Sequence, residues 1–230
     1  HRAQLYMIMR TGIPAGIQGM VFSLSNVVIL SSINLFGAIV VAGNAAAMNI
    51  EYIVYFAMNA FYQATISFTG QNMGAGNFRR IIRVQLTALA CVIVTGASVG
   101  GAVVFFGNEI AGLYSTDPDV ISSAMMRLKY LCLPYFLCGM MEIISGTLRG
   151  MGHSIIPTVT SLLGACAFRI LWIFTVFQIP AFHKLETIYA VYSISWTITF
   201  LALYVCFIIT MKKMVYSRIE RASRRVGSSL

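Results

Sequence analysis

Charged residues are scarce in this chain of 230 residues, because Asp, Glu, Lys and Arg together make up only 10% of it. Soluble domains usually contain about 25% charged residues. Hydrophobic residues make up 58%, and the mean hydropathy is +0.81. A soluble domain of this length has too little interior to bury so much apolar surface. The composition therefore excludes an ordinary soluble protein and indicates a chain that lies in a membrane.

The chain also lacks the residue patterns of common enzymes and metal sites. Its five cysteines lie within hydrophobic runs and do not have metal-ligand spacing, so we interpret them as small hydrophobic residues rather than as disulfides or ligands. The histidines, His1, His153 and His183, are scattered. No Ser/His/Asp or Cys/His pattern indicates hydrolysis. The sequence thus predicts neither an enzyme nor a resident cofactor.

Six long hydrophobic runs fill most of the sequence. Each is long enough to cross the ~30 Å hydrocarbon core of a bilayer as a helix, and they cover about residues 12–33, 37–69, 81–106, 120–147, 155–177 and 187–211. Backbone groups in lipid must be hydrogen-bonded within the protein, and the runs lack the period-two alternation of barrel strands. The predicted fold class is an all-α integral membrane protein with six transmembrane helices in one bundle.

The sign of the charged residues alternates from one gap between runs to the next. Bases gather before the first run and after the second, fourth and sixth. By the positive-inside rule, residues 1–11 form a cytoplasmic juxtamembrane segment and residues 212–230 a basic cytoplasmic tail at the cell membrane. Despite the net charge of +9, we expect the tail to contact anionic lipid headgroups rather than nucleic acid. The opposite side is predicted to carry Glu109, Asp117, Asp119 and Glu186, with only Arg127, Lys129 and Lys184 as bases.

Proline and glycine mark the places where helices bend or end. Pro134 lies deep enough in the fourth run to kink it. Two glycine-rich segments, residues 70–77 and 146–153, share the spacing G-x-x-x-G-x-G. Because no strand precedes either segment, we interpret them as tight cytoplasmic turns between helices rather than as nucleotide-binding loops.

Two carboxylates, Glu51 and Glu142, lie within the runs, and Arg169 lies within the fifth run. A charge near the bilayer centre costs on the order of 3 kcal/mol on insertion scales, so such residues usually serve a transport pathway or a partner. Glu51 belongs to a polar stripe that recurs every three or four residues and should face a cavity or the bundle interior. This stripe comprises Asn44, Met48, Glu51, Tyr55, Asn59, Tyr62, Thr65 and Thr69.

These polar residues have a structural and a functional interpretation. Shorter stripes, such as Ser23 and Asn26 on the first run, are expected to join helices through hydrogen bonds worth ~0.6 kcal/mol each. For Glu51, which lies at mid-depth, we favour a functional role. Arg169 is either the counter-charge of Glu51 or a structural cation. Glu142 lies nearer the inner end and has either a structural or an ion-coupling role.

Several segments resemble the multidrug and toxic compound extrusion (MATE) transporters. They are residues 12–14 (GIP), residues 70–77 (GQNMGAGN) with the basic pair that follows, and residues 148–152 (LRGMG) before Pro157. The resemblance extends from about residue 10 to residue 211. Such transporters have twelve helices in two six-helix lobes, and this chain resembles the second lobe. The resemblance implies a missing N-terminal six-helix lobe, against which the substrate cavity would lie.

The MATE resemblance also implies a function and its residues. The family exports amphipathic, often cationic organic compounds in exchange for Na⁺ or H⁺. Glu51 is then the first ion-coupling candidate, at which Na⁺ or a proton would bind, and Glu142 is the second. Other members use a carboxylate on the first helix of this lobe, and residues 12–37 contain none. The candidate cavity-lining residues are Asn26, Asn44, Met48, Tyr55, Asn59, Tyr62 and Arg169.

Two alternatives stay open at this point. Lipid-linked oligosaccharide flippases have related two-lobe bundles but usually need a strongly cationic cavity, and Arg169 is the only basic residue expected deep in this half. The other alternative is an inactive, truncated or accessory membrane subunit. Six further hydrophobic runs encoded upstream in the same frame would favour the transporter.

Overall fold

The computed structural model describes residues 2–227, apart from the side chains of residues 3, 7, 10, 11, 217–219 and 221–227. Parts of the two predicted terminal segments, His1 and residues 228–230, lie outside the described residues. The side chains of Arg10, Arg218, Arg221, Arg224 and Arg225, which contribute to the basic character of those segments, also lie outside them.

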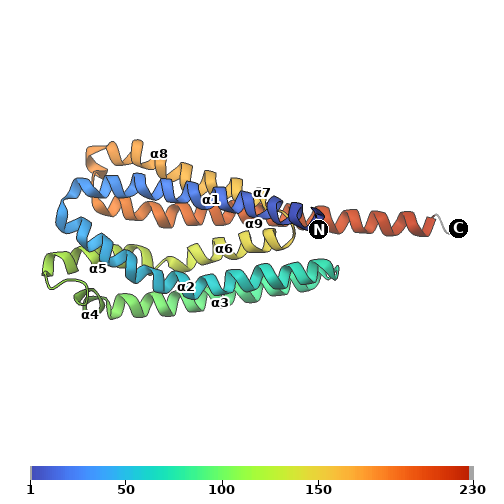
Figure 1. Ribbon diagram of the computed structural model, residues 1–230, viewed down its shortest axis with the longest axis horizontal. Helices are drawn as coiled ribbons and strands as arrows, with labels where there is room; N and C mark the ends of the chain where they lie inside the picture. Colours follow the sequence, from blue (N-terminus) through green and yellow to red (C-terminus); the bar gives the residue numbers. More distant parts are fainter. Residues whose placement is uncertain (1, 228–230) are drawn as a thin grey trace.

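Helices account for nearly all of the described chain (Figure 1). The α-helices are α1 (Arg2–Ile33), α2 (Ala38–Gly74), α3 (Phe78–Phe105), α4 (Gly107–Gly112), α5 (Pro118–Cys132), α6 (Tyr135–Gly150), α7 (Ile155–Ser161), α8 (Phe168–Phe174) and α9 (Leu185–Gly227). Three short 3₁₀ helices are η1 (Asn34–Phe36), η3 (Val176–Gln178) and η4 (Pro180–Phe182), and η2 (Leu162–Ala167) is a π-helix. Residues 2–227 contain no strand. The predicted all-α fold class is confirmed.

Five helical segments are long and apolar enough to cross a membrane, and the bent pair α5–α6 makes a sixth when it is counted as one span. The chain bends by 43° between the two helices of this pair. The break lies at Leu133 and Pro134, where the proline ring cannot donate a backbone hydrogen bond. Large apolar side chains such as Phe105, Leu163 and Leu171 remain exposed on the flanks of the bundle, where lipid would cover them. The chain is a multi-pass membrane protein.

The fifth predicted run, residues 155–177, is not one regular α-helix. The π-helix η2 separates α7 from α8. A π turn holds more residues than an α turn, so α8 is rotated relative to the side-chain pattern of α7. Gly164 of η2 lies so close to Thr199 of α9 that a β-carbon there would collide with the threonine hydroxyl. The sequence pattern of the run did not indicate this irregular segment.

The helices form two groups that lie side by side along the bundle (Figure 1). Helices α1, α7, α8 and α9 form the first group, and α2 to α6 form the second. Helix α9 joins the groups through extensive contacts with α6 and α5. Within the second group, α2 and α6 approach very closely, because a β-carbon at Gly150 would lie 2.7 Å from that of Thr69. The five cysteines are all described, and all are free.

The two glycine-rich turns lie at the same end of the bundle as both ends of the described chain (Figure 1). Gly76 and Gly152 adopt φ angles of 66° and 85° in these turns, a conformation that favours glycine. Exposed bases at this end include Arg79 and Arg80. Helix α9 continues past the bundle here (Figure 1), so the part of the basic tail that the structure describes is helical.

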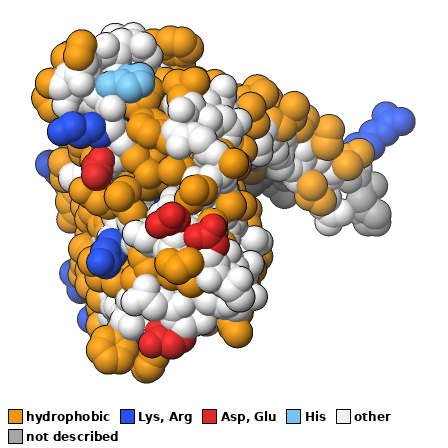
Figure 2. Space-filling view, turned by 90° about the vertical axis from the view of Figure 1, so that its left-hand side faces the viewer, with side chains coloured by type: hydrophobic (Ala, Val, Ile, Leu, Met, Phe, Trp, Pro, Cys, Tyr) orange, Lys and Arg blue, Asp and Glu red, His pale blue; other side chains and the backbone are white. Residues whose placement is uncertain are grey.

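The opposite end of the bundle carries several exposed acids. Figure 2 shows acidic side chains spread over this end among apolar ones, with basic side chains beside them. Helix α4 and the start of α5 lie here, where Glu109, Asp117 and Asp119 are exposed. The alternation of charge along the sequence thus corresponds to a separation of charge between the two ends of the bundle.

Candidate functional site

A cavity of about 710 Å³ lies between the two groups of helices. Helices α1, α8 and α9 line one side of it, and α2, α5 and α6 line the other. All nine candidate residues from the sequence lie on its wall, namely Asn26, Asn44, Met48, Glu51, Tyr55, Asn59, Tyr62, Glu142 and Arg169. The structure therefore brings together side chains from four of the six predicted runs.

The polar stripe of α2 supplies most of the cavity wall. Six of its residues, from Asn44 to Tyr62, line the cavity, because side chains three or four positions apart share one face of a helix. Asn59 donates a hydrogen bond to the hydroxyl of Tyr55 at 3.1 Å within this face. The stripe then continues into the protein, where Thr65 and Thr69 are fully buried on the side of α2 that faces α6.

Glu51 is held by an ion pair with Arg127 of α5. Nη2 and Nε of Arg127 donate to the same oxygen, Oε2 of Glu51, at 2.7 and 3.2 Å. Nη1 of Arg127 donates to Oδ1 of Asn44 at 2.8 Å. The Arg127 and Glu51 side chains are 5% and 14% exposed. The pair thus joins two helices inside the membrane, where removal of one partner would strand a buried charge.

This ion pair overturns three expectations. Arg127 was predicted on the outer, acidic side, and it is instead buried between α2 and α9. Arg169 was considered as the counter-charge of Glu51, and Arg127 takes that place. Arg169 is also not the only basic residue deep in the bundle. The spacing of Arg127 from Ala124 and Leu131, both on the buried face of α5, is the sequence signal that indicates its position.

Arg169 of α8 lies on the other side of the cavity and is only 3% exposed. Its Nε donates to Oγ of Ser195 at 2.9 Å. Its guanidinium stacks 4.2 Å from the centre of the Tyr192 ring and 5.9 Å from that of Trp196. Within residues 2–227, Nη2 of Arg169 has no hydrogen-bond partner, and no carboxylate lies within ion-pair distance of the guanidinium.

Glu142 of α6 is the second carboxylate of the cavity and differs from Glu51 in its surroundings. It borders a small recess beside Tyr55 and Asn59. Among the described residues, it has no partner in an ion pair or a hydrogen bond. About two turns further along α6, Nη2 of Arg149 donates to Oε1 of Gln18 at 2.6 Å and so joins α6 to α1. Glu142 is therefore a cavity carboxylate whose oxygens are free to bind a cation.

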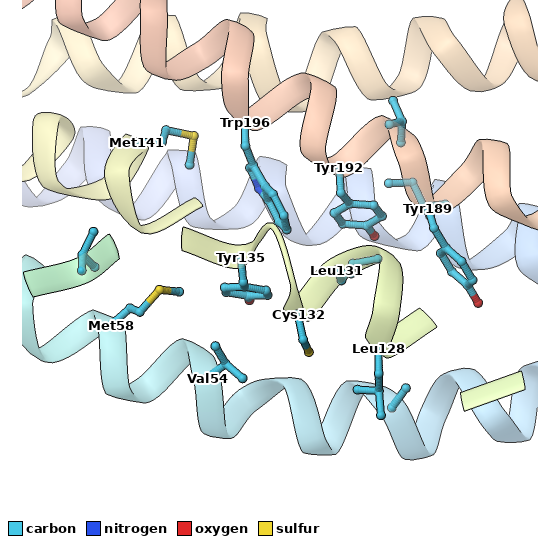
Figure 3. Packing of buried hydrophobic residues seen from close by; sticks show 14 of the residues in the cluster. Val54, Met58, Leu128, Leu131, Cys132, Tyr135, Met141, Tyr189, Tyr192 and Trp196 are labelled. Atoms are coloured by element: carbon cyan, nitrogen blue, oxygen red, sulfur yellow. The ribbon is translucent and has the colours of Figure 1, made fainter. Parts of the chain in front are cut away.

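Aromatic rings surround the break between α5 and α6. Figure 3 shows Tyr192 and Trp196 of α9 pointing toward this break, where Tyr135 begins α6, whereas Tyr189 lies farther along α9 beside α5. The Trp196 ring centre lies 5.2 Å from that of Tyr135 and 5.8 Å from that of Tyr192. Sequence analysis did not identify Tyr135 as a cavity residue, because its role depends on the break at Pro134. Such faces can stack against planar organic molecules or attract cations.

The sequence is similar to those of known proteins. A family model described as MatE matches residues 14–175. Probable multidrug resistance protein YpnP of Bacillus subtilis (strain 168) is 28% identical over 163 residues, which cover 71% of this chain and 37% of that protein. Probable multidrug resistance protein YoeA of the same strain is 24% identical over 217 residues, which cover 94% of this chain and 46% of that protein.

The fold is similar to that of solved transporters. The Vibrio cholerae MATE transporter VcmN in its bent form superposes with a TM-score of 0.81 and 16% identity, over 92% of this chain and 48% of that chain. The chain spans about half the length of the curated relatives that it matches. Its six-helix bundle therefore corresponds to about half of such a protein.

Proposed function

This chain belongs to the MatE family, and on that premise we propose that it forms one half of a cation-coupled antiporter that exports amphipathic organic compounds. Two relatives are named as multidrug resistance proteins. The cavity volume of about 710 Å³ lies within the range of about 300–1,000 Å³ of sites for drug-sized ligands. A second six-helix lobe, N-terminal to this one, would complete the transporter and close the other side of the substrate path.

The observation that carries ion coupling is the carboxylate of Glu142, which faces the cavity without a described partner. A proton or Na⁺ can bind there without breaking an existing contact. At Glu51, the same ion would have to displace Arg127 and leave a guanidinium buried without its partner. We therefore assign ion coupling to Glu142 first and to Glu51 second, which reverses the order suggested by the sequence.

Replacement of each carboxylate in the full-length protein tests this assignment. We expect Glu142→Gln to abolish export of ethidium driven by an imposed H⁺ or Na⁺ gradient in proteoliposomes. Glu109→Gln, which changes an exposed acid in the first turn of α4, should leave export unchanged. Gradient-driven export by Glu142→Gln at the wild-type rate would contradict the proposal, and comparison of the two gradients identifies the ion.

The separation of charge between the two ends supports a proposed orientation. The end with exposed Arg79, Arg80, Lys212 and Lys213 would face the cytoplasm, so both chain ends would be inside the cell. The basic part of α9 would then contact anionic headgroups. In intact cells, a membrane-impermeant maleimide should label Asp119→Cys, and it should label Asn77→Cys only after permeabilisation. The reverse pattern would invert the orientation.

A lipid-linked oligosaccharide flippase is the second candidate, because the cavity contains more basic residues than the sequence indicated. Three arginines line the cavity, Arg127, Arg149 and Arg169. The charge of Arg127 is already compensated by Glu51, however, which leaves a weaker cationic site than a pyrophosphate requires. Rescue of cell-wall synthesis in a flippase-deficient strain by the full-length protein would favour this candidate over drug export.

A further inference from the structure

The cavity contains a local excess of positive charge around Tyr192. Arg127 and Arg169 both place their guanidinium groups near this ring, at 5.8 and 4.2 Å from its centre. Only one carboxylate, that of Glu51, is paired with them, and it binds Arg127. Two buried guanidiniums and one carboxylate leave one positive charge uncompensated, and the contacts assign that charge to Arg169.

Arg169 has the features of a binding group rather than of a satisfied structural cation. It is 3% exposed and lines the cavity, and its Nη2 is without a partner in the part of the chain that the structure describes. A buried charge is unfavourable unless it is paired and hydrogen-bonded. The Tyr192 ring and Ser195 Oγ hold the guanidinium in position but supply no negative charge. An oxyanion from a ligand would supply both the charge and the missing acceptor.

We propose that Arg169 is an oxyanion-binding subsite, and that the substrates of the complete transporter include planar amphipathic compounds with a carboxylate, sulfonate or phosphate group. Arginine presents its donors in a planar fork that matches such groups. The rings of Tyr192 and Trp196, beside the guanidinium, offer faces on which a planar substrate can stack. This inference rests on the proposed export function and specifies its substrate class as organic anions and zwitterions.

The same cavity can hold both ends of a zwitterion. Glu142 lies on the opposite group of helices from Arg169 and has no described ion-pair partner. A compound with a cationic group and an oxyanion could therefore contact both residues, whereas a simple organic cation would use Glu142 and leave Arg169 without a counter-charge. A zwitterion therefore gains an interaction with Arg169 that a simple organic cation cannot make.

Two dyes with the same xanthene ring system and opposite charge test the subsite. Fluorescein carries a carboxylate and is an anion, and rhodamine 123 is a cation. Binding of each dye to the full-length protein in a neutral detergent can be measured by fluorescence anisotropy. We expect Arg169→Gln to weaken fluorescein binding by about ten- to a hundredfold and to leave rhodamine 123 binding unchanged or stronger. Arg83→Gln, an exposed arginine of α3, serves as the matched control.

The wild-type protein alone can overturn the inference, whether or not the Arg169→Gln variant folds. If the wild-type protein binds and exports rhodamine 123 but does not bind fluorescein, the proposed oxyanion subsite is wrong and the proposed export function stands. If it exports neither dye, the export function itself fails. Equal weakening of both dyes by Arg169→Gln would also overturn the subsite, because it would indicate general damage to the cavity.

A phospholipid headgroup offers the same oxyanion chemistry as a soluble substrate, so a further measurement separates the two. Fluorescein binding is repeated in mixed micelles that contain phosphatidylglycerol or phosphatidylcholine. We expect bound fluorescein to be retained in both. Displacement by phosphatidylglycerol alone would assign Arg169 to a lipid headgroup and overturn its assignment to exported compounds.

Discussion

Removal of Arg127 tests the buried ion pair that organises the centre of the protein. The Arg127→Gln substitution leaves Glu51, 14% exposed, without the guanidinium that donates to it at 2.7 and 3.2 Å. Breaking a buried pair in this way typically costs about 3–5 kcal/mol. Because Arg127 also donates to Asn44 and lies near Tyr189, the contact between α5, α2 and α9 would weaken at one point. We expect a clear loss of thermal stability.

The assay is thermal unfolding of the purified full-length protein in detergent, followed by circular dichroism. Lys129→Gln is the matched control, because Lys129 is an exposed base on the same helix, and surface substitutions usually change stability by no more than about 0.5 kcal/mol. The double variant Arg127→Gln/Glu51→Gln removes both charges and should recover most of the lost stability. If Arg127→Gln melts at the wild-type temperature, the pair does not hold these helices together.

Two further predictions concern packing and hydrogen bonding. Gly150→Ala should destabilise the protein by about 1–3 kcal/mol, because its new methyl group would overlap with α2. The control variant Gly101→Ala should be neutral or stabilising, because the space around Gly101 is open. Equal melting temperatures of the two variants would refute the close contact between α2 and α6. Asn44→Ala should cost about 1–3 kcal/mol by leaving Arg127 Nη1 without its acceptor, whereas exposed Asn49→Ala should cost little. Equal losses in these two variants would show that the buried hydrogen bond contributes nothing specific.

The parts of the fold that depend on local pattern could be predicted from the sequence. Long apolar runs determine where helices cross a bilayer, and the break between α5 and α6 follows from the missing donor of Pro134. The polar stripe of α2 could be assigned to an interior surface because lipid disfavours polar side chains. The π-helix η2 has no comparable signal, since its residues are as apolar as those of a regular span.

Partners across the bundle could not be predicted, because they depend on contacts between residues far apart in the chain. Glu51 and Arg127 are separated by 76 positions, and the sequence indicated only Arg169 as a possible partner of Glu51, because Arg127 was assigned to the outer, acidic side. The missing contact with Arg127 also hid the difference between the two carboxylates. Glu51 is already neutralised by a guanidinium, and Glu142 is not, so the functional ranking of the two acids changes once the contacts are known.

The assignment of ion coupling to Glu142 is tested most directly by the ion that leaves the cavity when substrate enters it. In weakly buffered detergent solution, binding of rhodamine 123 to the wild-type full-length protein should release a proton, or should compete with Na⁺ when Na⁺ is the coupling ion. We expect Glu142→Gln to lose this release or competition and Glu51→Gln to retain it. Loss in Glu51→Gln with retention in Glu142→Gln would contradict the assignment and place the coupling site at the ion pair instead.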